Sequence, residues 1–293
     1  MSEWALPILG SALVLGIYDV FKKHAVRDNS VMPVLFLATL SGTLFFMLLT
    51  AVRMSSSAAV IHWNSGVLFL VFLKSLLVSA SWAFVYYGLR ELPVSIASPL
   101  RATAPLWSII GAVIIFGEMP LKIQWAGMVL ILAGCFLFTL IGQKENFSWR
   151  SKGILYTMTG TLLGSASALY DKFLLGTKHL DPLSLQFHFS WMLVVILGAA
   201  LLCRHFFFSA GSRFQWRWSI VATGILLIIA DALYFYALSL PDAQISILSL
   251  LRRSSVVVAF AVGGRFFKEK MLLPKAAVLM VILAGAAILS LCK

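Results

Sequence analysis

The sequence predicts an all-α integral membrane protein, with ten transmembrane helices arranged as two inverted five-helix repeats. Three observations support this fold class: the composition, the length of the apolar tracts and an internal duplication. Of the 293 residues, 61% are hydrophobic and 12% are charged, and the mean hydropathy is +0.96. Soluble domains carry about 25% charged residues, so this composition argues against a water-soluble core.

Long apolar tracts cover nearly the whole chain and are joined by short polar segments. A transmembrane helix needs about 20 predominantly apolar residues. A membrane strand would instead show about ten residues of alternating polarity, whereas these tracts are longer and apolar all round. We therefore expect helical spans over residues 4–21, 33–52, 67–89, 94–116, 123–141, 153–174, 183–203, 218–240, 243–264 and 272–292.

The duplication is clearest in the second part of each half of the chain. Residues 94–140 align without gaps on residues 245–291, with 14 identities in 47 positions. The identical charged and hydroxyl residues are Ser95/Ser246, Ser98/Ser249, Arg101/Arg252 and Glu118/Glu269.

The repeat extends upstream, because Tyr18-Asp19 in the first span recurs as Tyr170-Asp171 in the sixth. The repeating unit thus holds five spans, and an odd number makes the second unit enter the membrane from the opposite side. Inverted repeats of this kind are typical of secondary transporters, whose substrate site lies near the midplane between the units. We predict one unit over residues 1–147 and the other over residues 148–293.

The net charge of +12 follows the expected topology. Five alternate loops hold 14 of the 23 Lys and Arg residues, whereas the other loops and the C-terminus hold 5. The positive-inside rule assigns the basic loops to the cytoplasm, so both termini are expected outside it. We expect a multi-pass protein of the cell (inner) membrane, embedded in the lipid bilayer, with no nucleic-acid partner.

Signatures of catalysis and of metal binding are missing from the sequence. The 3 cysteines are scattered and have no metal-ligand spacing. The chain has no H-E-x-x-H motif, no G-x-S-x-G elbow and no phosphate-cradling glycine loop. We expect no catalytic residue, no metal and no cofactor.

A family resemblance is carried by the stretch from Ala102 to Phe138. It has a proline in the fourth span, Gly-Glu at the end of that span and a glycine-spaced fifth span: Pro105, Gly117, Glu118, Gly127 and Gly134. This stretch resembles the EamA repeat of the drug/metabolite transporter superfamily. The second copy keeps Glu269 and Gly285 but has Val256 in place of the proline.

The resemblance covers nearly the whole chain in length, helix count and duplication. It implies a transporter of a small organic solute, with a cavity lined by spans one, three, four, six, eight and nine. The superfamily handles amino acids, drugs, nucleotide sugars, organic phosphates and polyamines, so the resemblance does not select the substrate.

Arg101 and Arg252 lie inside predicted spans, where a cation costs about 2.5–3.5 kcal/mol on insertion scales. Ser98 and Ser249 precede them by three residues and so share their helix faces. A guanidinium fork beside a hydroxyl suits a carboxylate or a phosphate. We therefore predict substrate binding by Arg101, Arg252, Ser98 and Ser249, assisted by Arg253 and Lys74.

The alternative is that these cations only form internal ion pairs. Asp231 is then the partner of Arg252 or Arg253, and Asp19 and Asp171, near span ends, pair with Lys23 or with loop residues. The four cations within the spans still outnumber the carboxylates by one when Asp19, Asp171 and Asp231 are all included. An unpaired buried charge is heavily penalised, so the surplus favours a bound anion.

The duplicated Tyr-Asp pairs are expected near opposite membrane faces. We interpret Tyr18, Asp19, Tyr170 and Asp171 as candidate gating residues, or as interfacial anchors. Asp231 is the candidate for a protonatable coupling residue, or else an ion-pair partner. Proton or counter-substrate coupling therefore remains open.

Aromatic residues occur at matching positions in the third and eighth spans. We interpret Trp82, Tyr86 and Tyr234 as substrate-binding residues, with ordinary helix packing as the alternative. The function predicted is an alternating-access transporter of a small organic metabolite, preferably anionic. One alternative is an exporter of amphipathic or zwitterionic solutes bound by the aromatic residues. Another is a lipid-handling or accessory membrane protein. The sequence does not select an oligomeric state.

Overall fold

A computed structural model describes residues 4–54, 65–117, 121–144, 151–174, 178, 180, 182–207, 213–239, 251–252, 254–268 and 272–291. Every regular element within these ranges is a helix. The helices are α1 (Ala5–Val26), α2 (Val31–Met54), α3 (Ser65–Glu91), α4 (Val94–Ala102), α5 (Ala104–Phe116), α6 (Lys122–Lys144), α7 (Lys152–Lys172), α8 (Pro182–Phe207), α9 (Trp218–Ser239), α11 (Ser255–Phe266) and α12 (Leu272–Leu291).

Several of these helices are suited to cross a membrane. By length and composition, five spans qualify among the described residues: Ala5–Val26, Val31–Ala51, Ser65–Glu91, Val94–Ile115 and Ser184–Cys203. Four shorter apolar helices accompany them: Trp125–Gly134, Trp218–Tyr234, Ser255–Phe266 and Leu272–Gly285. Large apolar side chains such as Leu273 (86% exposed) and Ile114 (77% exposed) point outward, as expected of helices surrounded by hydrocarbon.

The predicted spans overlap the observed helices, but one boundary is corrected. The sequence pattern placed Lys22 and Lys23 in a loop, whereas α1 continues to Val26 and both lysines are buried. The physical reason is that each ammonium has a partner inside the protein: Lys22 reaches Asp19, and Lys23 donates to backbone carbonyls at the end of α3. The predicted ninth span, 243–264, lies partly outside the described residues.

The predicted fourth span is divided into two helices, α4 and α5, with Thr103 as a turn between them. A matching turn occurs at Ser254, between the helical residues Leu251-Arg252 and α11. Each turn follows one of the duplicated arginines by two positions. The regular α-helix is therefore interrupted just after Arg101 in one half of the chain and just after Arg252 in the other.

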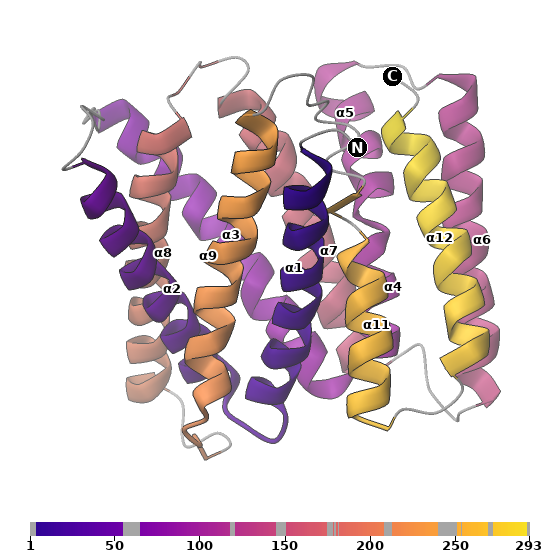
Figure 1. The fold of residues 1–293 in the computed structure, drawn as a ribbon, viewed down its shortest axis with the longest axis horizontal. Coiled ribbons are helices and arrows are strands. Elements are labelled where there is room, and N and C mark those ends of the chain that lie inside the picture. Colours follow the sequence, from indigo (N-terminus) through magenta and orange to yellow (C-terminus); the bar gives the residue numbers. More distant parts are fainter. Residues whose placement is uncertain are drawn as a thin grey trace.

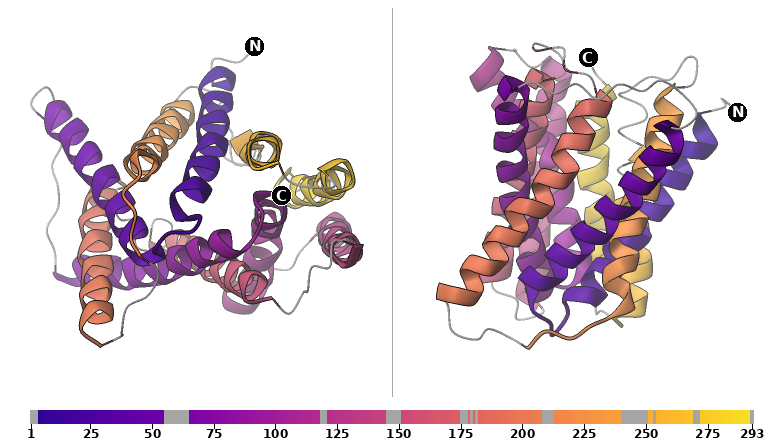
Figure 2. Two further views of the ribbon diagram at one scale, coloured as in Figure 1. Left: turned by 90° about the horizontal axis from the view of Figure 1, so that it is seen from below. Right: turned by 90° about the vertical axis from the view of Figure 1, so that its left-hand side faces the viewer.

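The helices pack as a bundle around a central space. α1 packs on α9 and α11, and α3 packs on α7 and α8. The pair α6 and α12 stands at one edge, with α2 and α8 at the other (Figures 1 and 2). α1 begins and α12 ends at the same end of the bundle (Figure 1).

α3 and α7 approach closely through Gly160. A Cβ atom built there would lie 2.9 Å from the carbonyl oxygen of Ser81 and 2.7 Å from a methyl of Val85. No larger residue fits without separating the two helices. This contact fixes the side of the bundle from which the hydroxyl residues described below face inward.

Candidate functional site

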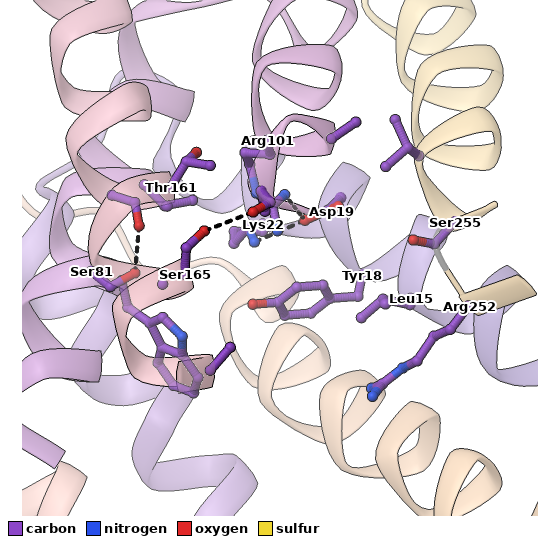
Figure 3. A pocket seen from close by; sticks show the side chains of 18 of the residues that line it. Leu15, Tyr18, Asp19, Lys22, Ser81, Arg101, Thr161, Ser165, Arg252 and Ser255 are labelled. Carbon is purple, nitrogen blue, oxygen red and sulfur yellow. Dashed lines mark hydrogen bonds and ion pairs between the residues drawn. The ribbon is translucent and has the colours of Figure 1, made fainter. Parts of the chain in front are cut away.

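A cavity of about 460 Å³ lies within the bundle, between α1, α3, α4, α5, α7, α9 and α11 (Figure 3). This volume is in the range of about 300–1,000 Å³ that is usual for small-molecule sites. The sequence-selected residues that line it are Tyr18, Asp19, Trp82, Tyr86, Arg101, Tyr234 and Arg252. The cavity therefore brings together residues from both halves of the chain.

The first charged cluster is centred on Asp19. One carboxylate oxygen, Oδ1, lies 2.8 Å from Lys22 Nζ and 2.8 Å from an Nη atom of Arg101. The Asp19 and Lys22 side chains are almost fully buried, at 5% and 2% exposed, whereas the Arg101 side chain is 30% exposed. A single carboxylate thus faces two cations, and Arg101 is the one that is open to the cavity.

Aromatic rings enclose Lys22. Its Nζ atom lies 4.2 Å from the centroid of the Tyr18 ring and 5.5 Å from that of Tyr86. Cation–π contacts of this kind contribute about 0.5–2 kcal/mol each, depending on desolvation. Lys22 thus lines the cavity as a nearly buried side chain that is held by Asp19 and the two tyrosine rings.

The guanidinium of Arg101 is incompletely used by the protein. Among the described residues its hydrogen-bond partner is Asp19, through one of its three nitrogens. A guanidinium carries five N–H donors in a fixed planar fork. In the described part of the chain the remaining donors have no partner, which leaves them for a ligand in the cavity.

Arg252 forms the second charged cluster. One of its Nη atoms donates to Asp231, and its Cζ atom lies 4.6 Å from the centroid of the Tyr234 ring. Its Nε atom is buried without a hydrogen-bond partner in the described part of the chain. Figure 3 shows Arg252 and Ser255 on the side of the cavity opposite Ser81 and Thr161.

A hydroxyl-bearing wall on α3 and α7 was not predicted. Ser81 Oγ donates to the Gly160 carbonyl at 2.7 Å, and Thr161 Oγ1 donates to the Thr157 carbonyl at 2.7 Å. Ser165 Oγ donates to the Ala104 carbonyl at 3.0 Å and so links α7 to the start of α5. In the sequence, the sixth span is rich in small and polar residues, which is the only sign of this wall. That pattern does not indicate which face of the helix points toward the cavity.

Other sequence-selected residues lie away from the cavity lining. Lys74 pairs with Asp171 at 2.6 Å, and its Nζ atom lies 4.6 Å from the centroid of the Phe189 ring. The Tyr170 hydroxyl donates to the Leu70 carbonyl at 3.2 Å.

Three predicted hydroxyl or cationic ligands remain untested by this geometry. Ser98 is buried and its hydroxyl has no partner among the described residues, but it does not line the cavity. Ser249 and Arg253 lie outside the described residues.

Of the partners expected for Asp19, Lys23 or a loop residue, Lys23 is not the one observed. Lys23 Nζ donates instead to the carbonyls of Leu89 and Leu92, at 2.5 and 2.7 Å. Both lysines are within reach of Asp19 along the helix, at i+3 and i+4. The carbonyls at the end of α3 hold Lys23, so Lys22 pairs with Asp19. Asp19 is therefore paired with Lys22 and Arg101.

Residues 2–140 match the sequence model of the EamA-like transporter family. The first half of the chain is therefore similar to this family. Together with the long apolar helices, this match supports a multi-pass membrane protein of the drug/metabolite transporter type. A comparison with curated proteins gives no match.

Solved structures support the fold. One of those that match, described as "Crystal structure of protein", superimposes with a TM-score of 0.66 over 100% of this chain and 98% of that one. The two sequences are 16% identical, so the likeness concerns the fold alone.

Proposed function

We propose that this chain is a secondary-active transporter that moves a small organic anion, bearing a carboxylate or a phosphate, by alternating access. The observation that carries the proposal is the position of Arg101, which is open to the cavity and shares its only carboxylate partner in the described structure with Lys22. The membrane is a cell (inner) membrane, with both termini outside the cytoplasm.

The charges around the cavity favour an anion. Lys22, Arg101 and Arg252 line it, and the carboxylates paired with them are Asp19 and Asp231. Three cations and two carboxylates leave one positive charge uncompensated among the described residues. Because unpaired buried charge is strongly unfavourable, a bound anion would be stabilised there by charge and by the free donors of Arg101.

Alternating access requires two halves that exchange roles, and we propose that residues 1–147 and 148–293 are those halves. Packing of α1 on α9 corresponds, under the repeat, to packing of α7 on α3. The contact between α6 and α12 is also reciprocal. A Cβ atom at Gly134 would meet Ile282, and one at Gly285 would meet Ile131, which are the equivalent positions of the duplication.

Contacts at opposite ends of the bundle are suited to act as gates. Lys23 ties α1 to the carbonyls that end α3, while the Lys74–Asp171 pair joins α3 to α7 near the other end of α3. We propose that these contacts form and break in alternation, with Tyr18 and Tyr170 beside them. Asp231 and Asp171 are the carboxylates proposed for proton or counter-substrate coupling.

The proposal is tested with purified protein in proteoliposomes. Arg101→Gln removes the open guanidinium, and Arg90→Gln is the matched control, because Arg90 pairs with Glu91 outside the cavity. We expect saturable anion uptake by the wild type and by Arg90→Gln, and at least a tenfold loss in Arg101→Gln. Equal uptake by all three proteins would contradict the role of Arg101.

A second candidate is favoured by the aromatic lining of Trp82, Tyr86 and Tyr234. If the substrate is amphipathic or zwitterionic and held by these rings, Trp82→Ala abolishes uptake while Arg101→Gln leaves it nearly unchanged. A lipid-handling or accessory protein would instead show no saturable flux of any water-soluble solute.

A further inference from the structure

The hydroxyl wall of the cavity has a defined hydrogen-bonding polarity. Ser81, Thr161 and Ser165 each line the cavity, and each donates its hydroxyl proton to a backbone carbonyl, of Gly160, Thr157 and Ala104 respectively. A hydroxyl has one proton and two lone pairs. With their protons engaged, these three oxygens present acceptors to the cavity.

The opposite polarity is found at Arg101. Its guanidinium nitrogens are donors only, and Arg101 lines the same cavity with donors that no other described residue occupies. Figure 3 shows Ser81, Thr161 and Ser165 on one side, with Asp19, Lys22 and Arg101 beyond them and Arg252 across the cavity. A ligand that satisfies both regions has an anionic group for Arg101 and hydrogen-bond donors for the α3–α7 wall.

The charge balance decides between the two kinds of donor, an ammonium and a hydroxyl. The wall is made of neutral oxygens. Asp19, which lines the cavity, is already held by Lys22 and Arg101, and Asp231 is held by Arg252. The anionic group of the ligand neutralises the one surplus positive charge, whereas an ammonium on the same ligand would restore an uncompensated charge, which is unfavourable in a desolvated site. A neutral hydroxyl donates to the same oxygens without that cost.

We propose that the transported anion is hydroxylated, and that Ser81, Thr161 and Ser165 select it by accepting hydrogen bonds from its hydroxyl groups. This inference rests on the proposed function, because it assumes that the anionic group of the substrate binds at Arg101. It adds the substrate class and three specificity-determining residues to that site.

The experiment compares three probes that differ at one carbon: 3-phenylpropanoate, 3-phenyllactate and phenylalanine. They share a carboxylate and an aromatic body and carry hydrogen, hydroxyl or ammonium at the second carbon. Affinities for the detergent-purified wild type are measured by thermal shift and by calorimetry. A neutral hydrogen bond contributes about 0.5–1.5 kcal/mol, so the hydroxy acid is expected to bind about two- to tenfold more tightly than the other two.

The variant Thr161→Val then tests whether the hydroxyl wall causes the preference for the hydroxy acid. Its matched control is Thr223→Val on α9. Thr223 is buried, and its Oγ1 atom donates to the Ser219 carbonyl, four residues earlier, at 2.6 Å, but it does not line the cavity. In Thr161→Val the preference for the hydroxy acid over 3-phenylpropanoate should fall toward one, with the affinity for 3-phenylpropanoate retained. In Thr223→Val the preference should remain.

The outcomes separate this inference from the function on which it rests. If 3-phenylpropanoate and 3-phenyllactate bind equally to the wild type and their binding requires Arg101, the proposed hydroxyl selection is wrong and the anion site at Arg101 stands. Tightest binding of phenylalanine would overturn the hydroxylated class in favour of a zwitterion. Absence of binding by all three, or binding independent of Arg101, would overturn both proposals. The wild-type series decides the substrate class even if a variant does not fold.

Discussion

Thr103 and Ser254 lie 151 positions apart and interrupt their helices in the same way. The backbone N–H of each donates to the carbonyl three residues earlier, Thr103 to Leu100 at 3.3 Å and Ser254 to Leu251 at 3.0 Å. The hydroxyl of each donates to that same carbonyl, at 2.7 and 2.6 Å. The duplicated arginines therefore precede two equivalent turns, although only the first half has a proline, Pro105, just beyond the turn.

The two turns should differ in their sensitivity to loss of the hydroxyl. Thr103 Oγ1 also accepts a bond from Trp107 Nε1 at 3.2 Å, so Thr103→Val leaves the indole without its partner. The indole is partly buried, so losing its acceptor costs toward the lower end of the about 1–3 kcal/mol for an unsatisfied buried donor. Ser254→Ala removes no such acceptor among the described contacts. We expect Thr103→Val to lower the melting temperature in detergent more than Ser254→Ala does. The reverse order would show that the indole bond is not maintained in the membrane protein.

Removing the shared carboxylate should make the cavity dependent on added anions. Asp19→Asn leaves Lys22 and Arg101 without their counter-charge, and loss of one member of a buried ion pair costs about 3–5 kcal/mol. The variant should melt earlier than the wild type and be stabilised more by a bound carboxylate, because the ligand replaces the missing charge. The measurement is the melting temperature with and without 3-phenyllactate.

The control for that experiment is Asp171→Asn. It also removes a carboxylate from an ion pair, with Lys74, but the pair does not line the cavity. We expect destabilisation without a larger response to the anion. An equal gain in both variants would mean that the anion acts elsewhere on the protein.

The role of Arg252 can be separated from its pairing with Asp231. Arg252→Met alone leaves the carboxylate unpaired, which is strongly destabilising, whereas replacing both partners by apolar residues is often nearly neutral. The double variant Arg252→Met/Asp231→Leu should therefore melt closer to the wild type than either single variant. Proteoliposome uptake by the double variant then decides the function: retained uptake assigns Arg252 to structure, and loss assigns it to transport.

Much of the fold was accessible from the sequence, because helices in a membrane must be long and apolar to satisfy their backbone in hydrocarbon. Arg101 and Arg252 were noticeable for the same reason, since a cation at that depth is costly, and both line the cavity. The break at Thr103 was less visible, because a threonine hydroxyl bonded to its own helix leaves no mark in a hydropathy pattern.

The rest of the site depends on how the helices are rotated about their axes. Lys74 was selected as a ligand by its depth, yet α3 turns it toward Asp171 and Phe189 and turns Ser81 into the cavity. Lys22 was assigned to a loop, because the sequence does not reveal that Asp19 and two tyrosine rings enclose it. Rotations of this kind are set by contacts between distant segments.

The α6–α12 contact provides a test of the reciprocal packing away from the cavity. A Cβ atom at Gly285 would lie 2.7 Å from the Gly127 carbonyl oxygen and 3.0 Å from the backbone nitrogen of Ile131, which cannot move alone. At Gly134 the close atom is Ile282 Cγ1, at 2.4 Å, in a side chain that can be shortened. Overpacking costs about 1–3 kcal/mol, so Gly285→Ala should lower the melting temperature more than Gly134→Ala.

Double variants identify the atoms responsible for the difference. Ile282→Ala removes the side-chain atoms that a new Cβ at Gly134 would meet. The double variant Gly134→Ala/Ile282→Ala should therefore have the same melting temperature as Ile282→Ala alone. Ile131→Ala leaves the Gly127 carbonyl in place, so Gly285→Ala/Ile131→Ala should still melt below Ile131→Ala. Equal losses in both pairs would mean that α6 and α12 separate freely and that the reciprocal contact does not hold them together.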